Sequence, residues 1–126
     1  MKVLGIIESA YRATIEEQDD TVVWFTHVLK GAGADVTVLL CGNAVNYAVR
    51  TQDASGLRFG ELRQTQAPRL AQDVGSLVAK GVRVLALTND LDDRGIAAAD
   101  VVEGLEYVPR AAMARLLGQF DQVWHW

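Results

Sequence analysis

Apolar residues follow one another in short continuous runs at five places along the chain. Runs of this length, rich in β-branched residues and bounded by glycine or polar residues, are typical of buried strands. They predict central strands at residues 3–7, 35–41 and 82–87, and shorter strands at residues 106–108 and 121–126.

The segments between these runs space their apolar residues every three or four positions, as amphipathic helices do. The two clearest helices begin near Asp20, which can cap a helix N-terminus, and at Pro68, and both end at a Lys-Gly pair. Shorter helices or turns are predicted at residues 44–49, 94–102 and 109–118. Residues 51–65 show no sustained period and are predicted to form a long, mobile loop.

Strands that alternate with helices indicate βαβ units and a parallel sheet covered by helices on both faces. The sequence therefore predicts an α/β fold, a three-layer α/β/α sandwich around a five-stranded, mainly parallel sheet. We expect a single domain over residues 1–126, since a chain of 126 residues fits one domain and shows no linker or repeat. The order of the strands does not follow from the pattern.

Composition narrows the classes of function. Half of the residues are apolar and 22% are charged, which is incompatible with global disorder. The net charge of −4 and the scattered Lys and Arg residues give no electrostatic footprint for nucleic acid. No apolar stretch reaches the roughly 20 residues of a membrane helix. One cysteine, Cys41, excludes an internal disulfide and a cysteine-rich metal site, and we expect a cytoplasmic protein.

Several segments of the chain together resemble the sequence pattern of a known protein family. They are the opening strand, the helix from Asp20, the segment Leu39-Leu40-Cys41-Gly42-Asn43-Ala44-Val45-Asn46, and Arg94-Gly95-Ile96 after the third long strand. In order and spacing the chain resembles the DsrE/DsrF-like family of small cytoplasmic sulfur-relay proteins, over nearly its whole length. The resemblance implies the fold described above and assembly into a homotrimer or homohexamer.

One residue of that family is missing here. Active members carry a cysteine shortly after the third strand, and this cysteine holds sulfur as a persulfide. The corresponding positions in this chain are Leu87, Thr88, Asn89 and Asp90. The resemblance therefore does not imply persulfide transfer at this place.

Five polar or small residues are candidates for ligand binding, because the carboxyl ends of parallel strands line the ligand crevice of α/β sheets. They are Gly42, Asn43, Asn89, Asp90 and Arg94. For Asn89 and Asp90 a second interpretation is local capping of the following turn, since such side chains often bond their own backbone. The acidic cluster of Asp90, Asp92 and Asp93 lacks the spacing of a calcium loop, and we expect a solvated turn without a metal.

Cys41 is the weak candidate for a nucleophile. It ends an apolar strand, where burial raises the pKa of a thiol, and it precedes a predicted helix, whose N-terminus lowers that pKa. We expect burial to dominate. His27 and His125 have no partner at catalytic or metal-ligand spacing, and no cofactor motif is present. Trp24, Trp124 and Trp126 are expected in a core or in an interface between copies.

We therefore expect a catalytically degenerate member of the sulfur-relay fold. It would act as an oligomer that binds a partner protein or a small ligand, without enzymatic activity. The alternative is an active sulfur carrier, with sulfurtransferase-like chemistry, that uses Cys41 in place of the missing cysteine.

Overall fold

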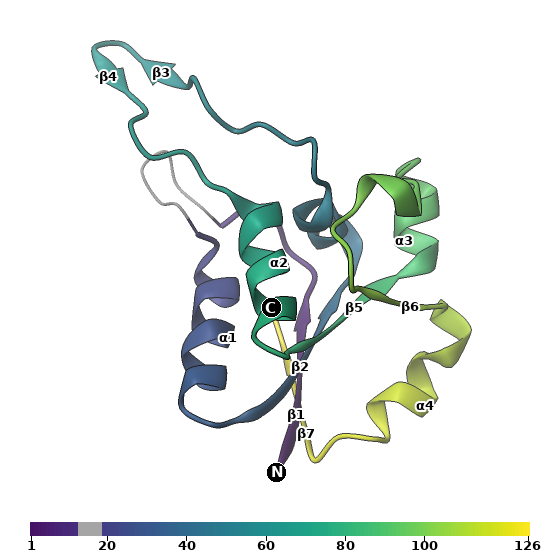
Figure 1. Cartoon of the computed structure of the whole chain (residues 1–126). Helices are drawn as coiled ribbons and strands as arrows, with labels where there is room; N and C mark the ends of the chain where they lie inside the picture. Colours follow the sequence, from purple (N-terminus) through teal and green to yellow (C-terminus); the bar gives the residue numbers. More distant parts are fainter. Residues whose placement is uncertain (13–18) are drawn as a thin grey trace.

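The computed structural model describes residues 1–12 and 19–126. Its sheet has five strands in the order β6-β5-β2-β1-β7, and every neighbouring pair is parallel (Figure 1). The strands are β1 Lys2–Ile7, β2 Asp35–Leu40, β5 Arg83–Leu87, β6 Glu106–Val108 and β7 Gln122–His125. The predicted five-stranded, mainly parallel sheet is confirmed, and each predicted strand agrees within two residues.

The central strands are buried on both faces, as parallel strands under two helical layers must be. Successive residues alternate between the faces, so β2 sends Val38 and Leu40 to one apolar cluster and Leu39 to the other. The next residue, Cys41, belongs to the same cluster as Leu39. Continuous apolar runs in the sequence are therefore the direct signature of this double burial.

Helices form the two outer layers. The first layer holds α1 Thr21–Gly31, α2 Leu70–Ala79 and the 3₁₀ helix η1 Gly42–Ala48, which share one apolar cluster. The second holds the 3₁₀ helix η3 Arg110–Ala112 and α4 Met113–Leu117, whose Leu116 enters the other cluster. In Figure 1, α1 and α2 lie on one side of the strands and α4 on the other. The three-layer α/β/α prediction is confirmed.

Two local features differ from the predictions. The turn expected within residues 94–102 is present as the 3₁₀ turn η2, Ala98–Asp100, but the sequence did not predict α3, Thr88–Asp93. The side chains of Asn89 and Asp90, at the start of α3, accept hydrogen bonds from Arg110 and Gly42. They therefore do not compete for the backbone N–H groups of their own segment, and this segment can be helical.

The second correction lies in the predicted loop at residues 51–65. It contains a short antiparallel ribbon of β3 Arg58–Phe59 and β4 Leu62–Arg63, which projects from the body of the molecule (Figure 1). Strands of two residues are too short to show an alternating pattern, so the sequence gives no signal for them.

Asp20 caps α1 as predicted, and it also links α1 to η1. Its Oδ1 accepts from the backbone N–H groups of Val22 and Val23 at 2.8 and 3.1 Å. The hydroxyl of Tyr47, in η1, donates to its Oδ2 at 2.7 Å. Both side chains are fully buried. Burial, and then the hydrogen bond to Asp20, raise the pKa of Tyr47, so its phenol keeps the proton that it donates to Asp20 and joins η1 to α1.

The C-terminal aromatic residues pack within the chain. Trp124 and Trp126 contact each other and Phe25 of α1, with ring centroids 6.1 to 6.5 Å apart. Trp24 differs, because 53% of it is exposed. No helix in the described residues is both long and apolar enough to cross a membrane.

Candidate functional site

The carboxyl ends of the parallel strands meet at one edge of the sheet. Ile7 of β1 pairs with Leu40 of β2, and Leu40 pairs with Ala86 of β5. The residues that follow these strands therefore converge. They are Glu8 after β1, Cys41 and Gly42 after β2, and Asn89 and Asp90 in the first turn of α3.

Asp90 lies at the centre of this edge and is 8% exposed. Its Oδ2 accepts from the backbone N–H of Gly42 at 2.6 Å. Its Oδ1 accepts from Nη2 of Arg110 at 2.8 Å, in an ion pair. Neither Asn89 nor Asp90 caps α3, whose N-terminus has no side-chain cap. The local-capping interpretation is therefore wrong, and Asp90 instead joins the ends of β2 and β5 to the segment after β6.

The exposed candidates form a rim around Asp90. Arg94 donates from Nη2 to Oδ1 of Asn43 at 2.8 Å and from Nη1 to the backbone carbonyl of Asp90 at 3.1 Å. Oδ1 of Asn89 accepts from the backbone N–H of Arg110 at 2.8 Å. The structure thus brings together all five predicted residues, Gly42, Asn43, Asn89, Asp90 and Arg94.

Gly42 occupies a position that only glycine fits easily. Its φ of +52° lies in the left-handed region, and a Cβ there would come within 2.9 Å of Cγ of Glu8. The backbone of Gly42 therefore lies close to Glu8 and donates to Asp90 at the end of β2.

Cys41 is buried, with 8% of the residue exposed. It belongs to the second apolar cluster, together with Ile6, Leu39 and Leu116. Burial, and then the negative charges of Glu8 and Asp90, raise its pKa to about 11 from the ordinary 9.0. This agrees with the expectation that burial outweighs the helix that follows. The following helix, η1, is a short 3₁₀ helix and offers only a weak dipole.

Sequence reasoning missed two groups at this edge. Arg110 lies 20 residues from Asp90, yet it follows the carboxyl end of β6 and so reaches the same edge of the parallel sheet. His125 ends β7 and pairs with Glu8, with Nε2 and Oε2 2.6 Å apart. A search for polar residues after every predicted strand, short ones included, finds Arg110. It does not find His125, which lies within the predicted strand at residues 121–126.

Among the described residues, no group of three or more His, Cys, Asp or Glu side chains is arranged to hold a metal ion. The site is therefore a hydrogen-bonded polar edge with a buried carboxylate at its centre. Two guanidinium groups, from Arg94 and Arg110, lie on its exposed rim. Such an arrangement can recognise anionic or amide groups, and its one thiol is poorly suited to nucleophilic attack.

Comparisons with known proteins identify the fold. No protein-family model and no curated protein matches the chain. Among solved structures it is similar to the ychN protein from E. coli, with a TM-score of 0.69 and 19% identity over 99% of this chain and 98% of that one.

It is also similar to MTH1491, a protein of unknown function from Methanobacterium thermoautotrophicum, with a TM-score of 0.55 and 21% identity. That match covers 95% of this chain and 94% of the other. Over nearly its whole length, this chain has the α/β fold of these two proteins.

Proposed function

We propose that this chain is a catalytically degenerate member of the DsrE/DsrF-like sulfur-relay fold. It acts in the cytoplasm as a homotrimer or homohexamer that binds a partner protein or a small ligand, and it carries no sulfur itself. The fold and the segments quoted above support the family. The polar residues that follow β5, where active members carry their cysteine, support the loss of the transfer step.

The state of Cys41 is the observation that carries the proposal. A sulfur carrier attacks its donor as a thiolate, so its thiol must be exposed and acidic. Cys41 is buried among apolar side chains, and the carboxylates nearest to it disfavour a second negative charge. With a pKa of about 11, roughly one thiol in ten thousand is ionised at neutral pH. This chain offers no other cysteine.

The polar edge is the proposed binding surface. Asp90 uses both carboxylate oxygens within the chain, so it positions Gly42 and Arg110 rather than contacting a ligand directly. Asn43, Asn89, Arg94 and Arg110 are exposed around it. Guanidinium groups bind carboxylates and other oxyanions through paired hydrogen bonds. The edge therefore suits a small anion or an acidic side chain of a partner protein.

Sulfur loading tests the proposal. The purified protein is incubated with a sulfur donor and its intact mass is measured. We expect no addition of a sulfur atom beyond the background of Cys41→Ser. The double variant Cys41→Ser/Asn89→Cys is the positive control, because it places an exposed cysteine after β5. A sulfur adduct on the wild-type chain that Cys41→Ser abolishes would overturn the proposal and favour the alternative, a persulfide carrier that uses Cys41.

A further inference from the structure

A hollow lies where the β3–β4 ribbon joins the body of the molecule, and we call it the ribbon hollow. Its volume is about 650 Å³, and its lining residues fall within residues 50–55 and 65–72. A volume of this size is typical of sites for small molecules. None of the lining residues belongs to the polar edge described above, so the ribbon hollow is a separate feature of the fold.

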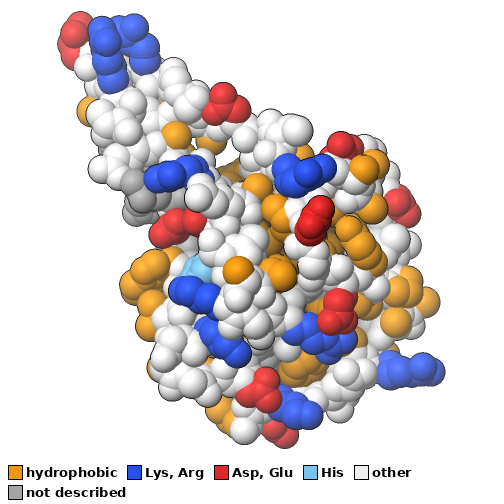
Figure 2. Space-filling view, viewed as in Figure 1, with side chains coloured by type: hydrophobic (Ala, Val, Ile, Leu, Met, Phe, Trp, Pro, Cys, Tyr) orange, Lys and Arg blue, Asp and Glu red, His pale blue; other side chains and the backbone are white. Residues whose placement is uncertain are grey.

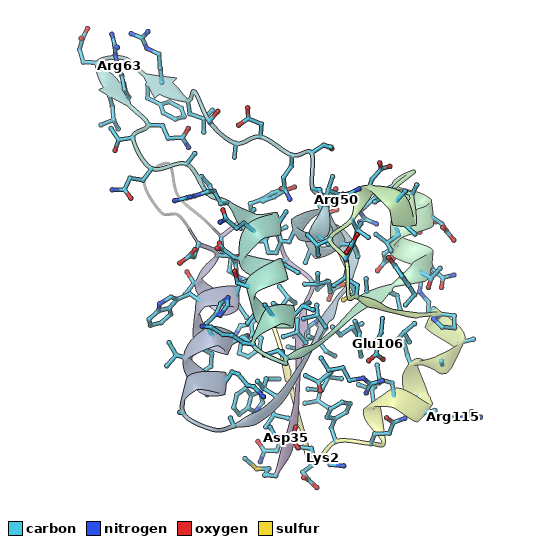
Figure 3. The ribbon with its side chains drawn as sticks, viewed as in Figure 1. Lys2, Asp35, Arg50, Arg63, Glu106 and Arg115 are labelled. Carbon is cyan, nitrogen blue, oxygen red and sulfur yellow. The ribbon has the colours of Figure 1, made fainter. Side chains whose placement is uncertain are left out.

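Two guanidinium groups, from Arg50 and Arg69, line the ribbon hollow. Among the described residues, neither of them forms an ion pair with a carboxylate. Arg50 is held by η2, because its backbone N–H donates to the carbonyl of Asp100 at 2.9 Å and its Nη2 donates to the carbonyl of Ala99. In Figure 2, basic side chains lie on both sides of the molecule where the ribbon joins the body, and Figure 3 places Arg50 on one of these sides.

The first turn of α2 also lines the ribbon hollow. Asp73 donates the first hydrogen bond of this helix, to the carbonyl of Arg69 at 3.0 Å, so the N–H groups of Leu70, Ala71 and Gln72 have no acceptor within the helix. No side chain caps them, since Arg69 stands at the N-cap position and a guanidinium can only donate. A positive charge at this end of a helix is unfavourable unless an anion lies nearby.

The carboxylates near the ribbon hollow compensate this positive charge only in part. Asp53 lines the hollow together with the two arginines, so the lining carries a net charge of +1. Oδ1 of Asp53 accepts from the backbone N–H of Ser55 at 2.9 Å. The acid in the first turn of α2 is Asp73, and burial, followed by its hydrogen bond to Asp19, favours its neutral form. The hollow therefore favours a ligand that brings negative charge.

We propose that the ribbon hollow binds the phosphate group of a small, polar phosphate ester, such as a sugar phosphate. The phosphate oxygens accept from Arg50, from Arg69 and from the first-turn N–H groups of α2. A phosphate suits this set of donors better than a carboxylate does, because it has three terminal oxygens and close to two negative charges. The phosphate fills only part of the hollow, and hydroxyl groups on the rest of the ligand can donate to Asp53.

Amide NMR spectra of the full-length protein test the proposal. The protein is titrated with ribose 5-phosphate, with inorganic phosphate and with acetate, all at constant ionic strength. We expect the N–H signals of Leu70, Ala71 and Gln72 to shift saturably with both phosphates, and ribose 5-phosphate to bind more tightly than inorganic phosphate. Acetate should bind far more weakly than either.

Substitutions of single arginines identify the groups that hold the phosphate. Arg50→Gln and Arg69→Gln should each weaken the binding of ribose 5-phosphate at least about 10-fold, as expected when a hydrogen bond to a charged group is lost. Arg115→Gln is the matched control, because it removes the same charge from an exposed position on α4 (Figure 3). This control should bind like the wild type. The amide spectrum of each variant also shows that it is folded.

Three results would overturn the proposal. The first is the absence of a saturable shift at the start of α2 with either phosphate. The second is equal weakening by all three substitutions, which would indicate general screening of charge. The third is a set of shifts confined to the polar edge around Asp90, which would place the anion there and leave the proposed function of that edge intact.

Discussion

Asp90 shows how one side chain can organise the polar edge of this sheet. Its carboxylate holds the backbone of Gly42 at the end of β2 and the guanidinium of Arg110 after β6. Its own backbone continues β5 into α3 and accepts from Arg94. A buried carboxylate is retained only when such partners offset its desolvation. The residue is therefore a positioning group for the exposed rim.

Replacing Asp90 should cost more than replacing its exposed partner. Asp90→Ala leaves the N–H of Gly42 without its acceptor, and we expect a loss of about 2 kcal/mol in the free energy of unfolding, typical for a hydrogen bond to a charged group. The side chain of Arg110 is 59% exposed, so Arg110→Ala should cost less than about 1 kcal/mol. Urea denaturation of both variants measures the difference. Equal losses, or no loss for Asp90→Ala, would contradict this account of the edge.

At the scale of elements, α1 and α2 pack side by side and bring two acids together. Asp19 precedes α1 and Asp73 lies in the first turn of α2. Burial of Asp73, and its hydrogen bond to Asp19, favour the protonated form and raise its pKa to about 7. Arg69 acts in the opposite direction but does not reverse the shift.

The pair of Asp19 and Asp73 predicts that the stability of the fold depends on pH. The pKa of Asp73 is higher in the folded state than its ordinary value of 3.8, so the folded state binds the proton more tightly. The stability that this group contributes is present below about pH 4 and is lost as the pH rises to about 7. Burial lowers the pKa of His27, so the folded state binds the proton of this group less tightly. His27 therefore reduces stability as the pH falls below its ordinary value of 6.5, which is opposite to the effect of Asp73.

The variant Asp73→Asn isolates the carboxyl, because the asparagine stays neutral and His27 is kept. We expect wild type to lose stability relative to Asp73→Asn as the pH rises from about 4 to about 7, and the difference to be constant above that. Urea unfolding at matched protein concentration over this range provides the two profiles. Profiles that run parallel would show that Asp73 titrates at its ordinary value.

At the scale of the whole molecule, the sheet was predictable because burial on both faces leaves continuous apolar runs. The convergence of Gly42, Asn43, Asn89, Asp90 and Arg94 was also predictable, since residues that follow parallel strands share an edge. Arg110 was missed although β6, the strand that it follows, was predicted with its observed bounds, because only the ends of the long strands were searched for site residues. The β3–β4 ribbon was missed because strands of two residues are too short to show an alternating pattern. The partners of Asp90 lie 20 and 48 residues away, beyond any local pattern.

The central proposal is that Cys41, the one cysteine of this chain, does not carry sulfur. The folded environment of Cys41 accounts for this, since two negative charges and an apolar cluster surround a thiol that would need to ionise.

The rate of Cys41 alkylation at neutral pH, in the folded and the denatured protein, tests this claim most directly. A pKa of about 11 against an ordinary 9.0 corresponds to a thiolate fraction about 100-fold smaller in the folded state. Burial slows the reaction further. We therefore predict that the folded protein reacts at least about 100-fold more slowly than the denatured chain. Alkylation of the folded protein as fast as that of the denatured chain would contradict the account.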